Sequence, residues 1–286
     1  MQRGAVSRAA MEYKPRRPDP CTLDLPRWPP EHGDVDIVET LSTAIERHQI
    51  VPYFQPQIDV ASRRVVAVEA LARWDHPVHG LLPPEVFIPA AQHHGMIDDL
   101  GILMVDAAAR AAVNWIAAGY PIQVSVNVSA TQLAGPRLTD WLRFLLERSA
   151  LPAESLIIEI TETNQFDDLP DVAGRLQELR GLGLGIAIDD FGAGFSSFAR
   201  LDQLPFTELK IDLSLVQDET DDGYAALIEI VEYAHSRGLR VVAEGVETLA
   251  QSHRVEALRC QRAQGYLFGK PMPEAALTQL LADRDG

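Results

Sequence analysis

The sequence predicts an α/β fold, a (β/α)8 TIM-like barrel with an antiparallel first strand. Short apolar runs, each of the length of a buried strand, alternate with amphipathic helical segments along most of the chain. Eight such runs with interleaved helices match a closed barrel better than an open, doubly wound sheet. An acidic or amide residue follows most of the runs, which is where a barrel of parallel strands collects its functional side chains.

The expected elements follow one another in a regular order. A helix comes first, over residues 36–48, where Ile37, Leu41 and Ala44 recur at helical spacing. The strands are expected near residues 51–55, 65–69, 123–128, 156–160, 185–189, 208–212, 239–243 and 264–267. The other helices are expected near residues 84–93, 97–118, 138–149, 170–180, 195–203, 223–236, 247–258 and 274–283.

A short connection joins the first two expected strands. Only residues 56–64 separate the run at 51–55 from the next one. A parallel pair needs a crossover of about a dozen residues or more, whereas an antiparallel pair needs only a hairpin. We therefore expect the first strand to run antiparallel to the second, which makes the barrel irregular.

The barrel domain is expected to cover residues 34–286. The preceding segment differs in composition, because residues 1–30 contain six Lys or Arg, three acidic residues and six of the 19 prolines. Residues 1–33 are therefore interpreted as a disordered, Pro-rich N-terminal arm. The arm is either an inert tail or a docking segment for a partner.

Composition excludes several classes of partner. The formal net charge of −16 argues against a nucleic-acid polymer, because phosphate contacts need a basic face. No apolar stretch reaches the roughly 18 residues of a membrane helix, and residues 1–10 lack the apolar part of a secretory signal. We therefore expect no membrane insertion and a cytoplasmic location. Cys21 and Cys260 are far apart and match neither a zinc pattern nor a disulfide framework.

Oxygen-bearing side chains follow the apolar runs and predict a metal site. These residues are Glu69, Asn127, Glu159, Asp189, Asp190 and Glu244, with Lys210 and Gln264 at comparable positions. Carboxylate and amide oxygens favour Mg²⁺, Mn²⁺ or Ca²⁺ over zinc. A single acidic residue after a strand is more often a helix cap or a turn residue, but five such coincidences in one chain are improbable.

The charge of the expected site favours two metal ions. Its five acidic side chains sum to −5 and Lys210 adds +1, so two divalent ions bring the total to zero. Without ions, so many carboxylates in one barrel mouth would repel each other and raise each other's pKa. Asp189 and Asp190 are consecutive, and at the end of a strand the second can turn over the rim, so that one of them can bridge two ions.

The local sequence around Glu69 resembles a known family. Residues 69–74, Glu-Ala-Leu-Ala-Arg-Trp, are similar to the signature of EAL-domain cyclic di-GMP phosphodiesterases. Further similar segments are Val126–Ser129, Glu159–Glu162, Asp189–Ser197, Leu209–Asp212, Ala243–Glu247 and Gln264–Tyr266. The resemblance covers residues 36–284, and the order of so many motifs makes it specific.

The resemblance implies a role for each of these side chains. One metal ion would be held by Glu69, Asn127, Glu159 and Asp189, and the second by Asp189 and Asp190. Glu244 would act as general base or orient the attacking water, and Lys210 would contact that water or the scissile phosphate. Gln264 would support the same inner shell.

Contacts to the substrate are also implied. Arg73 corresponds to an arginine near a substrate phosphate, and a surface ion pair is the alternative. Gln55 and Leu71 would line the nucleotide cleft, although Leu71 could instead be a packing residue. Glu162 would anchor a mobile loop over residues 191–197, for which an ordinary glycine-rich turn is the alternative.

Three residues depart from the family pattern. Ala193 stands where Thr is frequent, Phe195 where Tyr is frequent, and Gln92 where Glu is usual. The two changes in the loop remove two hydroxyl groups. These departures bear on loop order and regulation more than on catalysis, because none is an expected metal ligand.

The function implied is hydrolysis of cyclic di-GMP to linear pGpG by a water that two Mg²⁺ or Mn²⁺ ions activate. Two ions per active site and inhibition by Ca²⁺ are expected, and the resemblance implies a homodimer. The first alternative is an inactive cyclic di-GMP receptor. A Schiff-base aldolase with Lys210 as nucleophile is a further alternative, but a lysine among carboxylates stays protonated.

Overall fold

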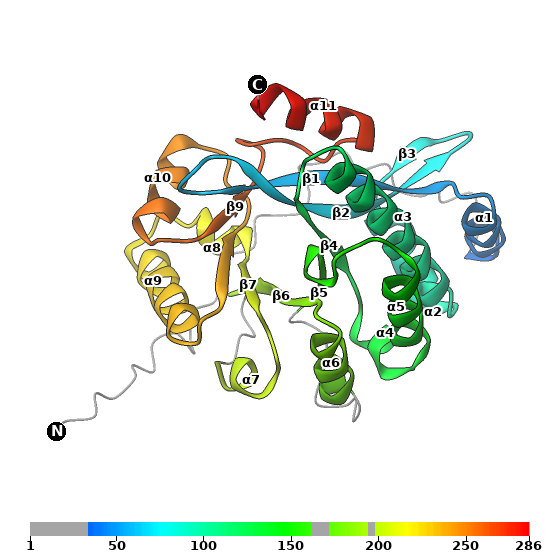
Figure 1. Ribbon diagram of the computed structural model, residues 1–286, viewed down its shortest axis with the longest axis horizontal. Coiled ribbons are helices and arrows are strands. Elements are labelled where there is room, and N and C mark those ends of the chain that lie inside the picture. Colours follow the sequence, from blue (N-terminus) through cyan, green and yellow to red (C-terminus); the bar gives the residue numbers. More distant parts are fainter. Residues whose placement is uncertain (1–33, 162–171, 194–197, 286) are drawn as a thin grey trace.

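Eight strands close into a barrel with helices around its outside (Figure 1). The computed structural model of the chain describes residues 34–161, 172–193 and 198–285. The barrel strands are β1 (Ile50–Asp59), β2 (Val65–His76), β4 (Gln123–Asn127), β5 (Leu156–Thr161), β6 (Gly185–Phe191), β7 (Glu208–Ile211), β8 (Arg240–Ala243) and β9 (Arg262–Gln264). A further strand, β3 (Gly80–Leu82), pairs with β2 and extends the sheet beyond the barrel.

The strand order confirms the predicted topology. Around the barrel the strands follow the order β1, β9, β8, β7, β6, β5, β4 and β2, and pairing of β2 with β1 closes the ring. β1 is antiparallel to both of its neighbours, and the other barrel strands pair in parallel. The β1–β2 connection is a tight turn in which Asp59 Oδ1 accepts hydrogen bonds from the backbone N–H and the Oγ of Ser62, each at 2.7 Å.

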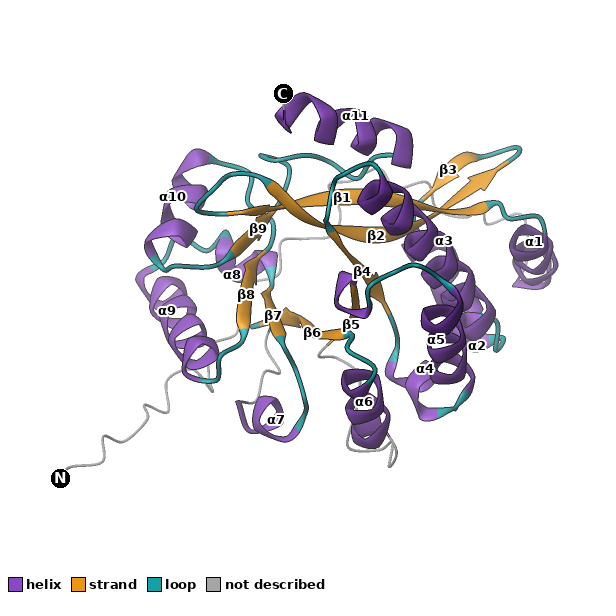
Figure 2. Ribbon diagram, in the orientation of Figure 1, coloured by secondary structure: helices purple, strands orange, loops and turns teal. Residues whose placement is uncertain are grey.

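Helices surround the strands on the outside of the barrel (Figure 2). The helices are α1 (Asp34–Glu46), α2 (Pro84–His93), α3 (Ile97–Ala117), α4 (Ala130–Ala134), α5 (Arg137–Arg148), α6 (Val172–Gly181), α7 (Phe198–Gln203), α8 (Leu213–Val216), α9 (Asp221–Ser236), α10 (Leu249–Ala257) and α11 (Glu274–Asp285), with a short 3₁₀ turn at Ala153–Ser155. α11 packs over the antiparallel strand β1 (Figure 1).

The parallel strands are buried on both faces. In β5, Leu156, Ile158 and Ile160 join the apolar layer between strands and helices, while Ile157 and Glu159 alternate with them. The alternation of side chains along a strand therefore directs Ile157 and Glu159 to the interior of the barrel. In such a strand, the apolar side chains on one face pack against the helices, while the acid on the other face places its carboxylate inside the barrel.

Helix α3 is long and apolar enough to cross a membrane by length and composition alone. Half of its apolar window is buried, and the helix packs against β1, β4 and α5. Its residue Trp115 contacts the ring of Phe54 edge-on, with ring centroids 4.9 Å apart, and donates from Nε1 to Thr278 Oγ1 at 2.8 Å. Helix α3 is therefore rich in apolar residues because one of its faces packs against the barrel.

The sequence missed three short elements and placed the ends of β1 and β2 too early. β3, α4 and α8 have three to five residues, too few for a recognisable periodicity. The N-caps Ser129 and Asp212 were the available signal, since their side chains accept backbone N–H bonds at the starts of α4 and α8. β1 extends beyond its predicted end because Pro56 and Gln57 belong to the strand despite not resembling apolar strand residues.

Candidate active site

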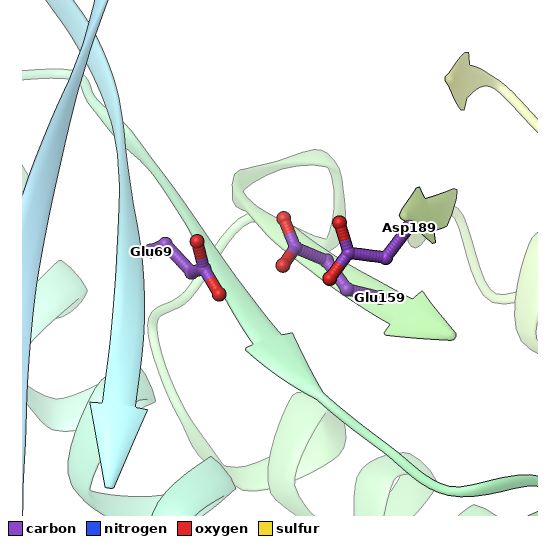
Figure 3. A group of neighbouring side chains, drawn as sticks. All are labelled: Glu69, Glu159 and Asp189. Atoms are coloured by element: carbon purple, nitrogen blue, oxygen red, sulfur yellow. The ribbon is translucent and has the colours of Figure 1, made fainter. Parts of the chain in front are cut away.

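The predicted site residues converge at the carboxyl ends of the barrel strands. They come from β2 (Glu69), β4 (Asn127), β5 (Glu159), β6 (Asp189 and Asp190), β7 (Lys210), the position directly after β8 (Glu244) and the end of β9 (Gln264). Figure 3 shows the carboxylates of Glu159 and Asp189 side by side, with the Glu69 side chain directed toward them from β2. Strand pairing alone places Asn127 directly beside Glu159.

Lys210 lies at the centre of these carboxylates. Its Nζ is 2.8 Å from Glu159 Oε2, 2.8 Å from Glu244 Oε1, 3.0 Å from Asp189 Oδ1 and 3.3 Å from Glu69 Oε2. The Lys210 side chain is fully buried. Burial lowers the pKa of a lysine, but the surrounding carboxylates outweigh it, so the pKa of Lys210 lies well above its usual value.

The Glu69 carboxylate is held by three donors. Oε1 accepts from Asn127 Nδ2 at 2.6 Å, and Oε2 accepts from Gln264 Nε2 at 2.7 Å and from Lys210 Nζ at 3.3 Å. Burial raises the pKa of Glu69, but the charge of Lys210 and the hydrogen bonds from Gln264 and Asn127 bring it below its usual value. Glu69 is therefore ionised at neutral pH.

A bulge in β6 allows the side chains of the consecutive residues Asp189 and Asp190 to lie in the same carboxylate cluster. The pairing of β6 with β7 shifts register between Ile188 and Phe191, and Asp190 has a left-handed backbone with φ of 56°. Regular pleating would send Asp190 to the opposite face from Asp189. Burial, followed by the charges of Asp189 and Asp212, raises the pKa of Asp190 to about 7.

The carboxylates form two groups that share Asp189. Oxygens of Glu69, Glu159 and Asp189 lie within 4.8 Å of one another, and so do oxygens of Asp189, Asp190 and Glu244. Glu159 Oε1 is buried without a hydrogen-bond partner among the residues that the structure describes. An all-oxygen donor set with an unpartnered buried carboxylate oxygen fits divalent cations such as Mg²⁺ or Mn²⁺.

Besides Asp190, three carboxylates resist ionisation in the metal-free protein. Burial is the main cause that raises the pKa of Glu159, Asp189 and Glu244, and repulsion from neighbouring carboxylates adds to it. The charge of Lys210 acts in the opposite direction and is too small to offset both effects. Further positive charge would therefore stabilise the ionised site.

The three residues expected to contact the substrate have different surroundings. Leu71 lines a cavity of about 240 Å³ beside Asn127, together with Gln92, Gln132 and Thr161. Arg73 donates from Nη1 to the carbonyl of Ala72 at 2.8 Å and forms no ion pair with a residue that the structure describes. Gln55 is buried and donates from Nε2 to the carbonyl of Gly269 at 3.3 Å.

Several residues named from the sequence lie outside the described part of the chain or outside the carboxylate cluster. Glu162, Phe195 and Cys21 lie outside the described residues, whereas Cys260 is a buried, free cysteine. Ala193 directly follows the β6 bulge region, and its N–H donates to the carbonyl of Asp190 at 3.3 Å.

The sequence did not assign Gln57 to the site. Its side chain is fully buried and hydrogen-bonded to Gln264. Its position two residues after Gln55, on the same face of β1, was the signal that could have identified it.

The match to a described family agrees with this geometry. The family described as "EAL domain" matches residues 38–271. The chain belongs to the EAL domain family. The resemblance and the barrel fold predicted from the sequence are therefore confirmed.

Relatives of this EAL domain include proteins named for cyclic di-GMP turnover. It is 38% identical over 251 residues to "Bifunctional diguanylate cyclase/cyclic di-GMP phosphodiesterase MucR" of Pseudomonas aeruginosa, covering 87% of this chain and 37% of that protein. It is 35% identical over 253 residues to "Cyclic di-GMP phosphodiesterase RocR" of the same organism, covering 88% of this chain and 64% of that protein. The chain thus spans less than two thirds of the length of these relatives.

Two solved structures with a similar fold are described as complexes with c-di-GMP. The structure "PaMucR Phosphodiesterase, c-di-GMP complex" matches with a TM-score of 0.80 and 38% identity, covering 85% of this chain and 99% of that one. The FimX EAL domain from Pseudomonas aeruginosa bound to c-di-GMP matches with a TM-score of 0.75 and 26% identity, covering 83% and 96% of the two chains.

Proposed function

We propose that this EAL domain is a metal-dependent phosphodiesterase that hydrolyses one phosphodiester bond of cyclic di-GMP to give linear pGpG. The observation that carries the proposal is the pair of carboxylate clusters that share Asp189, one buried and one partly buried, with the buried Lys210 among them. Relatives named as cyclic di-GMP phosphodiesterases support the substrate.

The residues fall into two metal-binding groups in this proposal. Glu69, Asn127, Glu159 and Asp189 hold one ion, and Asp189 and Asp190 hold the other, with Glu244 close to the second group. Two bound divalent ions would supply an acidified attacking water and stabilise charge on the leaving oxygen. Mg²⁺ or Mn²⁺ suits this role, whereas Ca²⁺ is expected to compete for the oxygens and to inhibit because its bonds are longer and its geometry is looser.

The remaining side chains manage protons and substrate. Glu244 accepts a proton from the attacking water or orients it, and protonated Lys210 donates to that water or to the scissile phosphate. Gln264 keeps the Glu69 carboxylate in place. Arg73 pairs with a substrate phosphate through its guanidinium, and Leu71 and Gln55 line the nucleotide cleft.

We further propose a homodimer, a cytoplasmic location and a role of Glu162 in anchoring the loop after Asp190. The barrel domain is proposed to cover residues 34–286, and residues 1–33 lie outside the part of the chain that the structure describes. The aldolase alternative is disfavoured, because the four carboxylates around Lys210 oppose the loss of its proton.

Product analysis tests the function. The purified chain is incubated with cyclic di-GMP and Mg²⁺ or Mn²⁺, with EDTA, and with Ca²⁺, and nucleotides are separated by chromatography. We expect pGpG with Mg²⁺ or Mn²⁺, none with EDTA and little with Ca²⁺. Tight binding of cyclic di-GMP without pGpG would replace the enzyme by a receptor, and no binding would reject both.

A further inference from the structure

Three glutamines form a buried amide group next to Glu69. Gln55 and Gln57 are two residues apart on β1, so both side chains face the barrel interior. In the strand register, Gln55 lies opposite Glu69 on β2 and Gln57 lies opposite Gln264 on β9. The antiparallel β1 therefore places its glutamines between the two strands that contribute Glu69 and Gln264.

The hydrogen bonds of Gln264 allow one orientation of its amide. Glu69 Oε2 accepts from the Lys210 ammonium group at 3.3 Å, so Gln264 presents its donor Nε2 to this same acceptor oxygen, at 2.7 Å. Gln264 Oε1 then faces away and accepts from Gln57 Nε2 at 2.9 Å. Gln264 Nε2 also donates to Gln55 Oε1 at 3.1 Å. In the flipped amide, an oxygen would face the Glu69 carboxylate and Gln55 Oε1, and the hydrogen bond from Gln57 would be lost.

Gln57 uses only one side of its amide. Its side chain is fully buried, and its Oε1 has no hydrogen-bond partner within the described part of the chain. An unsatisfied buried carbonyl lowers stability, and an apolar side chain of the same size would avoid this loss. The donor Nε2 is therefore the feature that distinguishes Gln57 from a packing residue.

We propose that Gln57 is a positioning residue of the metal centre, which fixes the amide orientation of Gln264 and thereby holds the Glu69 carboxylate toward Lys210. Outer residues that orient metal ligands typically change metal affinity or activity by about 10–100-fold when mutated. The effect on turnover rests on the proposed function, whereas the effect on metal binding does not.

A double-mutant cycle tests this assignment in the full chain. Mn²⁺ affinity is measured by calorimetry, and kcat and KM for cyclic di-GMP are measured for wild type, Gln57→Met, Gln264→Leu and the double variant. We expect Gln57→Met to weaken Mn²⁺ binding by about 10-fold or more and to lower kcat with little change in KM. The double variant should be no worse than Gln264→Leu alone, because Gln57 acts through Gln264.

A matched control removes a buried polar atom elsewhere. Thr139, on α5, is fully buried, and its Oγ1 also has no hydrogen-bond partner among the described residues. Thr139→Val should leave Mn²⁺ affinity and kcat at their wild-type values. Unchanged Mn²⁺ affinity and kcat in Gln57→Met, or losses that multiply in the double variant, would overturn the proposal.

A measurement on the wild-type protein covers the case in which Gln57→Met does not fold. In ¹⁵N-glutamine-labelled protein, the side-chain NH₂ of Gln264 should exchange slowly with solvent and show two distinct proton resonances. Fast exchange or averaged resonances would contradict a fixed amide. If the wild-type chain forms no pGpG, the proposed function fails, while the Mn²⁺ affinities and the exchange data still decide the role of Gln57.

Discussion

The two ends of the barrel each contain a buried ionic cluster, and the clusters differ in charge balance. At the amino ends of the strands, Glu208 Oε2 is 3.0 Å from Arg240 Nη1 and 3.4 Å from Arg262 Nη1, and both arginines also donate to Gln123. At the carboxyl ends, one lysine faces four carboxylates. One acid with two cations lies at one end, and an excess of acids lies at the other.

This difference separates a structural cluster from a functional one. The arginines at the amino ends outnumber the acid they contact, so this end needs no added cation to balance Glu208. The five acids and Lys210 at the carboxyl ends leave a charge of −4 when all are ionised, and side chains within the cluster cannot balance it. In barrel enzymes the amino-terminal face contributes stability and the carboxyl-terminal face carries the chemistry.

The largest expected effect is a loss of turnover when the cluster at the carboxyl ends is mutated, with little loss when the cluster at the amino ends is mutated. Glu69→Ala should lower kcat about 10³-fold at saturating Mn²⁺, since a metal centre contributes several kcal/mol to the transition state. Glu208→Gln removes the acid of the opposite cluster and should keep kcat within about 3-fold, because it lies at the face that contributes stability. Steady-state kinetics on both proteins test this contrast, and similar losses in both would reject the division into two roles.

The second prediction concerns the stability of the metal-free protein. Lys210→Met leaves four carboxylates, three of them buried, without their cation and should lower the free energy of unfolding by about 3–5 kcal/mol in EDTA. Mn²⁺ should recover part of this loss, because it supplies positive charge to the same oxygens. Urea denaturation followed by circular dichroism measures both values. A variant as stable as wild type in EDTA would show that Lys210 is not needed for charge balance.

Metal binding should stabilise the fold through one cluster only. At a free Mn²⁺ concentration 100 times the Kd, the free energy of unfolding should rise by about 2.7 kcal/mol for each independent site. Glu159→Gln should abolish most of this gain, whereas Glu208→Gln should retain it. Thermal melting with and without Mn²⁺ provides the readout, and an equal gain in the two variants would place the ions elsewhere.

The last prediction is a pH dependence that arises at Asp190. Burial, with Asp189 and Asp212, raises the pKa of Asp190 from 3.8 to about 7 in the folded protein. The resulting stabilisation is complete below the unfolded pKa and is lost as the pH rises through about 7. In EDTA, Asp190→Asn should therefore gain Tm relative to wild type with rising pH, by about 2–4 °C for each 1 kcal/mol. A Tm difference that does not change with pH would contradict the shift.

The sequence was sufficient to predict the barrel, and it also pointed to side chains that the fold brings together, for a physical reason. An acid at the end of a buried strand is visible in sequence, and parallel strands must bring their carboxyl ends together. The antiparallel β1 followed from the short connection to β2. These inferences depend only on local pattern and chain length.

Other features could not be predicted, because they depend on contacts between distant segments. The left-handed Asp190 and the register shift in β6 result from pairing with β7. The hydrogen bond from Gln57 to Gln264 exists only because β9 lies beside β1. The orientation of the Gln264 amide likewise depends on Glu69 on another strand.

The measurement that tests the central claim most directly is the dependence of turnover on metal in stripped protein. After treatment with EDTA and dialysis, formation of pGpG is followed while Mn²⁺ is added in steps to a known concentration of chains. We predict no turnover without metal and full activity only after two ions per chain have bound. Turnover in the stripped protein, or full activity with a single ion per chain, would contradict the two-metal account of the carboxylate cluster.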